Sequence, residues 1–149
     1  MSEIFQIYLA GASYFEEDEG AGWRNKAVQM FKTVVKDVDV QVRVFNPLDF
    51  FSYSEVKHQS DTQVKQYYMD QIKHSRIVLC NLDRSRTSPG TAQELQYAID
   101  NKVPIISFCT DDNVYPWLKV DSQVVFSSML QAVDYIVEYY LRQGRLKDE

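Results

Sequence analysis

Apolar residues along the chain follow two kinds of pattern. Short apolar runs at residues 5–10, 40–45, 77–81, 103–108 and 124–126 are typical of β-strands. Between most of these runs, apolar residues recur every three or four positions, which is typical of helices with one buried face. The helical stripes are Trp23, Ala27, Met30, Phe31, Val34 and Val35; Val64, Tyr68 and Ile72; Ala92, Leu95 and Ile99; and Leu130, Val133, Val137, Tyr140 and Leu141.

The order of these patterns is strand-helix-strand-helix-strand-helix-strand-strand-helix. Strands that alternate with helices predict an α/β protein, here a three-layer flavodoxin-like or Rossmann-like sandwich with a mainly parallel five-stranded sheet. The run 77–81 has no polar alternation until its end, which is typical of a strand that is buried on both faces. The length of 149 residues predicts a single domain over residues 1–149.

Composition and charge argue against two classes of partner, nucleic acids and membranes. The formal net charge is −5 and there is no long basic run, which argues against a nucleic-acid partner. No apolar stretch approaches the roughly 20 residues that a membrane span needs. Residues 1–3 lack the features of a signal peptide. We therefore expect a cytoplasmic protein that does not act at a membrane.

The two cysteines, Cys80 and Cys109, both fall in predicted buried strands. This placement favours reduced thiols over a disulfide, as in a cytosolic protein. The cysteines do not have metal-ligand spacing, and His58 and His74 are not near them in the sequence. We therefore expect no metal site.

The segment after the 77–81 run carries the clearest candidate for chemistry. The sequence Ser88-Pro89-Gly90-Thr91-Ala92-Gln93-Glu94 places a carboxylate near the start of a helix, at the carboxyl edge of the sheet, where open α/β sheets bind ligands. In one interpretation Thr91 caps the helix and Glu94 closes a capping box. In the other, Ser88 is the N-cap and Pro89 the first helical residue, which leaves Glu94 on the second turn and free to face a pocket.

Two other segments have both a functional and a purely structural interpretation. Gly11-Ala12-Ser13 follows the first strand, where small residues let a ligand approach and backbone amides hold an anion, but a tight turn explains them equally well. The spacing is neither GxGxxG nor a Walker loop. Residues 47–61 lack periodicity and carry three aromatic residues, which suits either a loop over a site or an ordinary surface loop.

Several segments together resemble the nucleoside 2-deoxyribosyltransferase family. They are residues 7–11 (IYLAG), Asn46-Pro47, residues 77–83 (IVLCNLD) and residues 90–98 (GTAQELQYA). The resemblance implies cleavage of the N-glycosidic bond of a 2′-deoxynucleoside. The glutamate that matches Glu94 attacks the anomeric carbon and forms a covalent glycosyl-enzyme, from which a second base accepts the sugar. The tyrosine that matches Tyr8 hydrogen-bonds and orients this glutamate.

The chain departs from the family pattern at its acidic positions. Ser88 stands where typical members carry an aspartate, six residues before the nucleophile, and Tyr68 stands at the aspartate position of the second helix. Arg76 replaces the usual acidic residue before the third strand. Asp83 is then the first candidate for handling the leaving base, and Asp70 the second.

A serine at position 88 is similar to the related nucleoside 5′-monophosphate N-glycosidases, in which serines and an arginine hold the phosphate. This likeness makes Ser13, Arg24 and Ser88 candidates for an anion site. The full set of expected substrate-binding residues is Gly11, Ala12, Ser13, Arg24, Asn46, Ser88, Gly90, Thr91 and Asn113.

The family also implies partners. We expect a small-molecule nucleoside or nucleotide, a free nucleobase, and a homo-oligomer (a dimer or higher) in which Asn113 acts from a neighbouring subunit. No cofactor is expected, because the leaving group is a protonated base and the acceptor is a base or water. The alternatives to a transferase are a 5′-monophosphate hydrolase, a non-catalytic nucleotide-binding module, and a plain structural domain.

Overall fold

A single parallel sheet organises the molecule. The computed structural model describes residues 4–12, 20–35, 38, 40–49, 60–111 and 114–142. Its strands are β1 (Ile4–Gly11), β2 (Gln41–Phe45), β3 (Ile77–Asn81), β4 (Ile105–Phe108) and β5 (Val124–Phe126), in the spatial order β2-β1-β3-β4-β5. Every neighbouring pair is parallel. The predicted α/β fold is confirmed, and the strand order is the flavodoxin-like one, with its switch point between β1 and β3.

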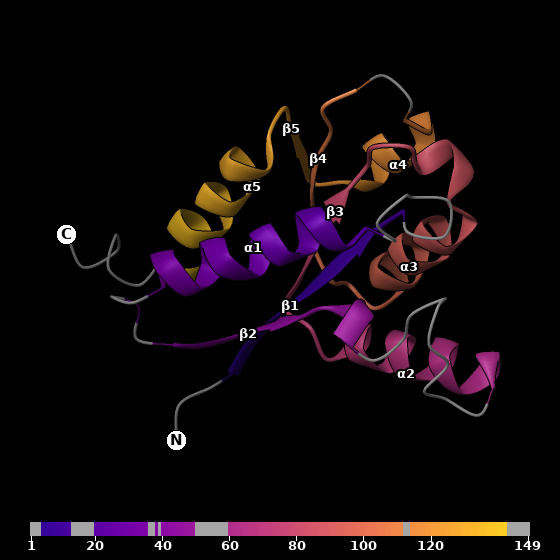
Figure 1. Ribbon diagram of the computed structural model, residues 1–149, viewed down its shortest axis with the longest axis horizontal. Coiled ribbons are helices and arrows are strands. Elements are labelled where there is room, and N and C mark those ends of the chain that lie inside the picture. Colours follow the sequence, from indigo (N-terminus) through magenta and orange to yellow (C-terminus); the bar gives the residue numbers. More distant parts are fainter. Residues whose placement is uncertain are drawn as a thin grey trace.

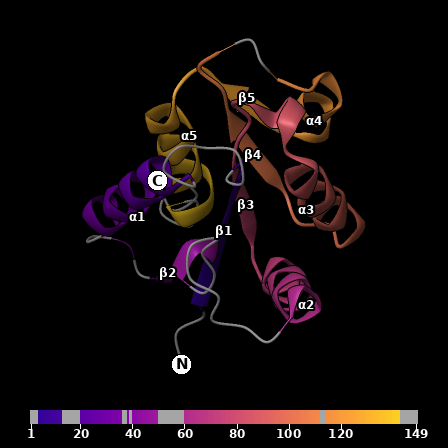
Figure 2. The same ribbon diagram turned by 45° about the vertical axis from the view of Figure 1, so that its right-hand side comes forward.

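Helices cover both faces of the sheet (Figures 1 and 2). On one face lie α1 (Ala21–Val34) and α5 (Met129–Ile136), which continues into a π-helical turn, Val137–Leu141. On the other lie α2 (Asp61–Lys73), α3 (Pro89–Asp100) and α4 (Pro116–Asp121). Short 3-10 turns, Pro47–Asp49 and Ser85–Thr87, follow β2 and β3.

The interior strand β1 is buried on both faces because its residues alternate between two cores. Phe5, Ile7 and Leu9 pack in the core beneath α1 and α5. Tyr8 and Ala10 pack in the opposite core, with side chains of α2, α3 and α4. The period-two geometry of a strand therefore points Tyr8 toward the side of the sheet that carries α3.

The sequence patterns missed one helix and assigned two exposed residues to buried helix faces. The six-residue α4 lies between β4 and β5, where a direct strand-to-strand link was expected, and only Leu118 in it is buried, so it leaves no periodic stripe. Ile99 and Leu130 were assigned to buried stripes, but they are 38% and 55% exposed. Cys109 follows β4 and is only partly buried, and neither cysteine forms a disulfide.

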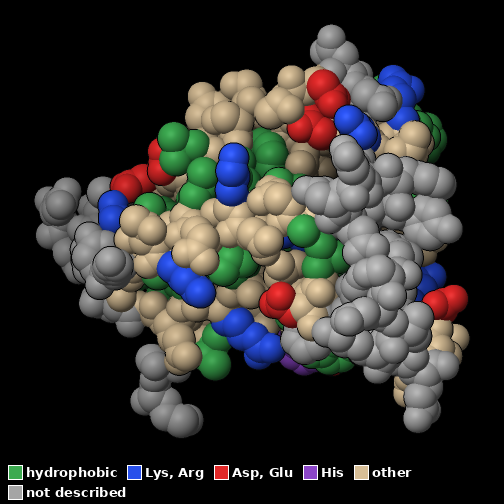
Figure 3. Space-filling model, viewed as in Figure 1, with side chains coloured by type: hydrophobic (Ala, Val, Ile, Leu, Met, Phe, Trp, Pro, Cys, Tyr) green, Lys and Arg blue, Asp and Glu red, His purple; other side chains and the backbone are tan. Residues whose placement is uncertain are grey.

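On the face of the molecule in Figure 3, the lysine and arginine side chains of the described residues are scattered, and some of them lie beside Asp or Glu side chains. None of the helices in the described part of the chain combines the length and apolar character that crossing a membrane requires.

Candidate active site

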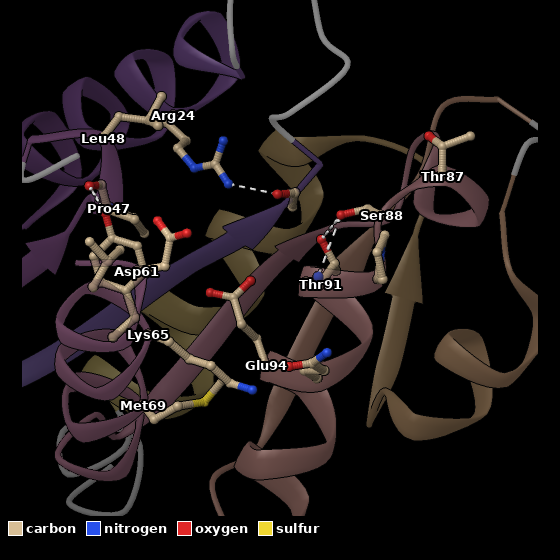
Figure 4. A pocket seen from close by; sticks show the side chains of 16 residues that line it. Arg24, Pro47, Leu48, Asp61, Lys65, Met69, Thr87, Ser88, Thr91 and Glu94 are labelled. Carbon is tan, nitrogen blue, oxygen red and sulfur yellow. Dashed lines mark hydrogen bonds between the residues drawn. The ribbon is translucent and has the colours of Figure 1, made fainter. Parts of the chain in front are cut away.

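A cavity of about 570 Å³ opens at the carboxyl edge of the sheet, between α2 and α3 (Figure 4). Its walls come from the end of β1, from α1, from the turn after β2, from α2 and from the start of α3. The lining residues are Gly11, Arg24, Pro47, Leu48, Asp61, Val64, Lys65, Tyr68, Met69, Thr87, Ser88, Pro89, Gly90, Thr91, Gln93 and Glu94. Open parallel sheets bind ligands at this edge, so the cavity is the candidate active site.

The start of α3 decides how Glu94 is presented. Ser88 is the N-cap and Pro89 the first helical residue, and the Ser88 hydroxyl accepts a hydrogen bond from the Thr91 amide at 3.4 Å. The Thr91 hydroxyl lies 2.6 Å from the same oxygen. The interpretation in which Ser88 is the N-cap, rather than Thr91, is therefore correct. Because Ser88 does the capping, Glu94 lies on the second turn of the helix and faces the cavity.

Tyr8 and Glu94 meet beneath the cavity. The Tyr8 side chain is fully buried and its ring stacks on Phe45, with ring centroids 5.4 Å apart. Its hydroxyl donates a hydrogen bond to the Glu94 carboxylate. A rigid, buried donor of this kind limits the orientations that the carboxylate adopts.

Burial sets the protonation of both groups. It raises the pKa of Glu94 from an ordinary 4.5 to about 7, against the lowering effects of the Tyr8 hydrogen bond and the Arg24 charge. Burial and then the Glu94 charge raise the pKa of Tyr8 well above 10.0, so Tyr8 stays a protonated donor. A carboxylate that titrates near neutral pH inside a cavity is typical of a catalytic group.

Arg24 reaches the cavity from α1 and braces the loop after β1. Its side chain is 3% exposed, and its guanidinium donates to the carbonyl oxygens of Gly11 at 2.8 Å and Gly20 at 3.2 Å. Burial lowers the pKa of Arg24, and the nearby Glu94 and Tyr8 raise it. The Nε atom of Arg24 is buried and has no hydrogen-bond partner within the described part of the chain.

Two glycines make room for this arrangement. A Cβ at Gly20, whose φ is +80°, would lie 2.2 Å from Nη1 of Arg24. A Cβ at Gly11 would lie 2.9 Å from Cζ2 of Trp23. The packing of Trp23 therefore requires glycine at position 11. Gly11 also lines the cavity, where the sequence suggested close approach of a ligand.

The structure brings together most of the expected site residues. Gly11, Arg24, Ser88, Gly90, Thr91 and Glu94 line the cavity. Tyr8 contacts it through Glu94. Asn46 is buried beside the lining residue Leu48 and accepts a hydrogen bond from the Leu48 amide at 3.1 Å, while Ala12 is buried directly after β1. Ser13, Asn113 and the aromatic residues Phe50, Phe51 and Tyr53 lie outside the described residues.

The two carboxylates expected to handle the base do not line the cavity. Asp83 accepts hydrogen bonds from the Thr110 amide and hydroxyl, both at 2.6 Å, and from the Asp111 amide at 3.1 Å, so it holds the loop after β4. Asp70 is exposed on α2, where its Oδ1 lies 3.5 Å from Nδ1 of His74. Asp83, two residues after β3, acts as a turn former because its carboxylate meets the free amides of the loop after β4.

Sequence reasoning missed the polar residues of the α2 wall. Asp61, Lys65 and Tyr68 line the cavity from α2, and the Tyr68 hydroxyl donates to the Pro47 carbonyl at 2.6 Å. Gln93, on α3, lines the cavity too. The available signal was spacing, because residues 61, 65 and 68 recur at helical intervals on the face that also holds Val64 and Ile72. In the described chain, no group of three or more His, Cys, Asp or Glu side chains is placed to hold a metal ion.

Comparison with solved structures supports the fold. A 2-deoxyribosyltransferase from Bacillus psychrosaccharolyticus is 24% identical, with a TM-score of 0.67 over 87% of this chain and 91% of that one. A 2-deoxyribosyltransferase from Leishmania mexicana is 23% identical, with a TM-score of 0.63 over 92% and 99% of the two chains. A conserved protein from Enterococcus faecalis V583 is 14% identical, with a TM-score of 0.58 over 89% and 87%.

Comparison with family sequences extends this result. A search of curated proteins gives no match. The sequence pattern of the family described as nucleoside 2-deoxyribosyltransferase matches residues 7–139, which span β1 to the π-helical turn after α5. Because this match covers most of the chain, the chain belongs to the nucleoside 2-deoxyribosyltransferase family.

Proposed function

We propose that the protein transfers 2-deoxyribose between nucleobases through a covalent intermediate on Glu94. Family membership supports deoxyribosyl transfer as the class of reaction. The observation that carries the proposal is the buried hydrogen bond from Tyr8 to the Glu94 carboxylate, at the base of a cavity large enough for a small-molecule ligand. This arrangement suits a carboxylate that attacks in one fixed direction.

The first half-reaction releases the donor base. A Glu94 carboxylate oxygen attacks C1′ of the deoxyribose, and the bond between C1′ and the base nitrogen breaks. The electron pair of that bond goes to the base, which takes up a proton as it leaves. The transition state resembles an oxocarbenium ion, which the negative charge of Glu94 stabilises.

The second half-reaction reverses the first. A nitrogen of the acceptor base attacks C1′ and loses its proton, while the bond from C1′ to the Glu94 oxygen breaks and returns the carboxylate. If water attacks instead, the products are free deoxyribose and the regenerated enzyme. Exclusion of water by the acceptor base therefore decides between transfer and hydrolysis.

A second candidate is hydrolysis of a 2′-deoxynucleoside 5′-monophosphate. Arg24 favours it, because its buried side chain lines the cavity and its Nε has no hydrogen-bond partner among the described residues. Ser88 and the first residues of α3 line the same cavity. A phosphate in this corner would meet a cation and a helix N-terminus together.

Product analysis separates the candidates. Purified protein is incubated with deoxynucleosides or their 5′-monophosphates, with and without a free acceptor base, and the products are separated by chromatography. A new nucleoside that forms only with the acceptor supports the transferase. Free base released mainly from monophosphates supports the hydrolase, and Arg24→Ala should then impair monophosphates far more than nucleosides. Binding without any turnover leaves a nucleotide-binding module.

A further inference from the structure

The α2 wall carries two charged side chains that have no partner in the described part of the chain. Asp61 and Lys65 lie four residues apart on α2 and both line the cavity. Figure 4 shows the Asp61 carboxylate on the Arg24 side of the Glu94 carboxylate, and Lys65 reaching from α2 toward α3 on the other side of it. Among the described residues, neither side chain forms a hydrogen bond or an ion pair, with each other or with a third group.

Helix stability explains why Asp61 stands at its position, but it does not explain why both side chains are unpaired among the described residues. A carboxylate in the first turn is favourable near the positive end of the helix dipole, which suits Asp61. Opposite charges four residues apart on a helix are placed to form an ion pair, but Asp61 and Lys65 do not form one. Two oppositely charged groups that line one cavity without partners among the described residues offer an acceptor and a donor to a polar ligand.

We propose that Asp61 and Lys65 bind the nucleobase and select guanine. The two carboxylate oxygens of Asp61 accept from the N1–H and the 2-amino group, while the Lys65 ammonium donates to O6. This inference rests on the proposed function, since it names the base that the same cavity takes. Carboxylates accept from base amino groups and lysines donate to guanine O6 in protein–nucleic acid complexes, so both pairings use ordinary chemistry.

The other bases satisfy the pair less completely. Hypoxanthine keeps N1–H and O6 but lacks the 2-amino group, so one carboxylate oxygen stays unpaired. Adenine offers one amino group beside a ring nitrogen, and thymine offers a single imide N–H. Guanine alone among these four presents two adjacent donors next to an acceptor, which a carboxylate and an ammonium pair with together.

Calorimetric binding tests the inference independently of turnover. The Glu94→Gln protein is titrated with deoxyguanosine, deoxyinosine, deoxyadenosine and thymidine, then again after adding Asp61→Asn or Lys65→Met. Each added substitution should lower the affinity for deoxyguanosine by about 10- to 100-fold and the affinity for thymidine by much less. Asp134→Asn on α5 and Lys73→Met at the end of α2 are matched controls, because both residues are exposed and neither lines the cavity.

The outcomes separate the two proposals. Equal affinity for the four nucleosides, or an equal loss for all of them on substitution, overturns guanine selection. Guanine-selective binding by a wild-type protein that cleaves no deoxynucleoside overturns only the proposed function. Cleavage by the wild-type protein with no preference for guanine overturns only the inference, and failure of every nucleoside to bind overturns both.

Discussion

The two walls of the cavity are built in opposite ways. On the α3 side, Glu94 is tied to the fully buried Tyr8, and the helix that carries it begins at a capped serine. On the α2 side, Asp61 and Lys65 are exposed and lack hydrogen bonds and ion pairs within the described structure. The α3 side holds its carboxylate in a single geometry, and the α2 side leaves its two charged groups available.

This difference suggests a division of work. Reaction at C1′ needs a carboxylate whose direction is fixed before substrate arrives, because misplacement of a reacting group is costly. Recognition of a base needs unsatisfied donors and acceptors, and exposed side chains provide these without destabilising the fold. We expect substitutions on the α3 side to act on turnover, and those on the α2 side to act on base preference.

The largest expected effect comes from removing the nucleophile. Glu94→Gln keeps the shape of the side chain and its ability to accept from Tyr8, but lacks the negative charge, so kcat should fall about a thousand-fold or more. Initial rates of base release measure this. The exposed Asp100→Asn, at the far end of α3, is the matched control and should leave the rate unchanged. A loss below ten-fold would argue against a nucleophilic Glu94.

The same substitution should stabilise the protein at high pH. Folding raises the pKa of Glu94 from 4.5 to about 7, so the contribution of this residue to stability is fully present below pH 4.5 and is lost as the pH rises toward 7. Above pH 7, Glu94→Gln should unfold with a free energy higher than wild type by up to about 3 kcal/mol. Urea unfolding at pH 4.5 and pH 8 tests this, and a difference that does not grow with pH contradicts it.

Removing the orienting hydroxyl should have a smaller effect. Tyr8→Phe deletes a hydrogen bond to a charged group, and kcat/KM should fall about 10- to 100-fold. Since that hydrogen bond lowers the pKa of Glu94, its loss should also move the acidic limb of the pH–rate profile to higher pH. The exposed Tyr139→Phe serves as control. A lower rate with an unmoved limb would point to a packing defect.

The smallest effect is expected from the hydroxyl of Tyr68 on α2. Tyr68→Phe deletes the 2.6 Å hydrogen bond to the Pro47 carbonyl and keeps the ring beside Phe45. The free energy of unfolding should fall by about 1 kcal/mol, and kcat should change less than in Tyr8→Phe. Thermal unfolding and steady-state rates measure both quantities. A loss of kcat as large as that of Tyr8→Phe would contradict the proposed division between the walls.

The sequence predicted the α3 side well because its signals are local. The apolar run of β3 and the Ser88-Pro89 helix start identify the strand, the cap and the position of Glu94. The pairing of Tyr8 with Glu94, which lie 86 positions apart, came from family resemblance and from no pattern in the chain itself. Parallel strands bring such distant residues to one edge, and only the strand order says which ones meet.

The α2 side and the loops were harder to predict. Charged residues on a helix, such as Asp61 and Lys65, look the same in sequence whether they face water or a cavity. Asp83 was the first candidate for the leaving base because other residues occupy the acidic positions of the family pattern, but the loop after β4 supplies amides that satisfy its carboxylate. The short α4 was missed because one buried residue, Leu118, makes no periodicity.

Mass spectrometry of the trapped enzyme tests the covalent step directly. Wild-type protein is mixed with a deoxynucleoside in the absence of acceptor base, quenched rapidly in acid, digested and searched for modified peptides. We predict one deoxyribosyl group on the peptide that contains Glu94, absent from the Glu94→Gln protein and lost when acceptor base is added before the quench. Transfer of the sugar without any adduct, or an adduct on a different residue, would contradict Glu94 as the nucleophile.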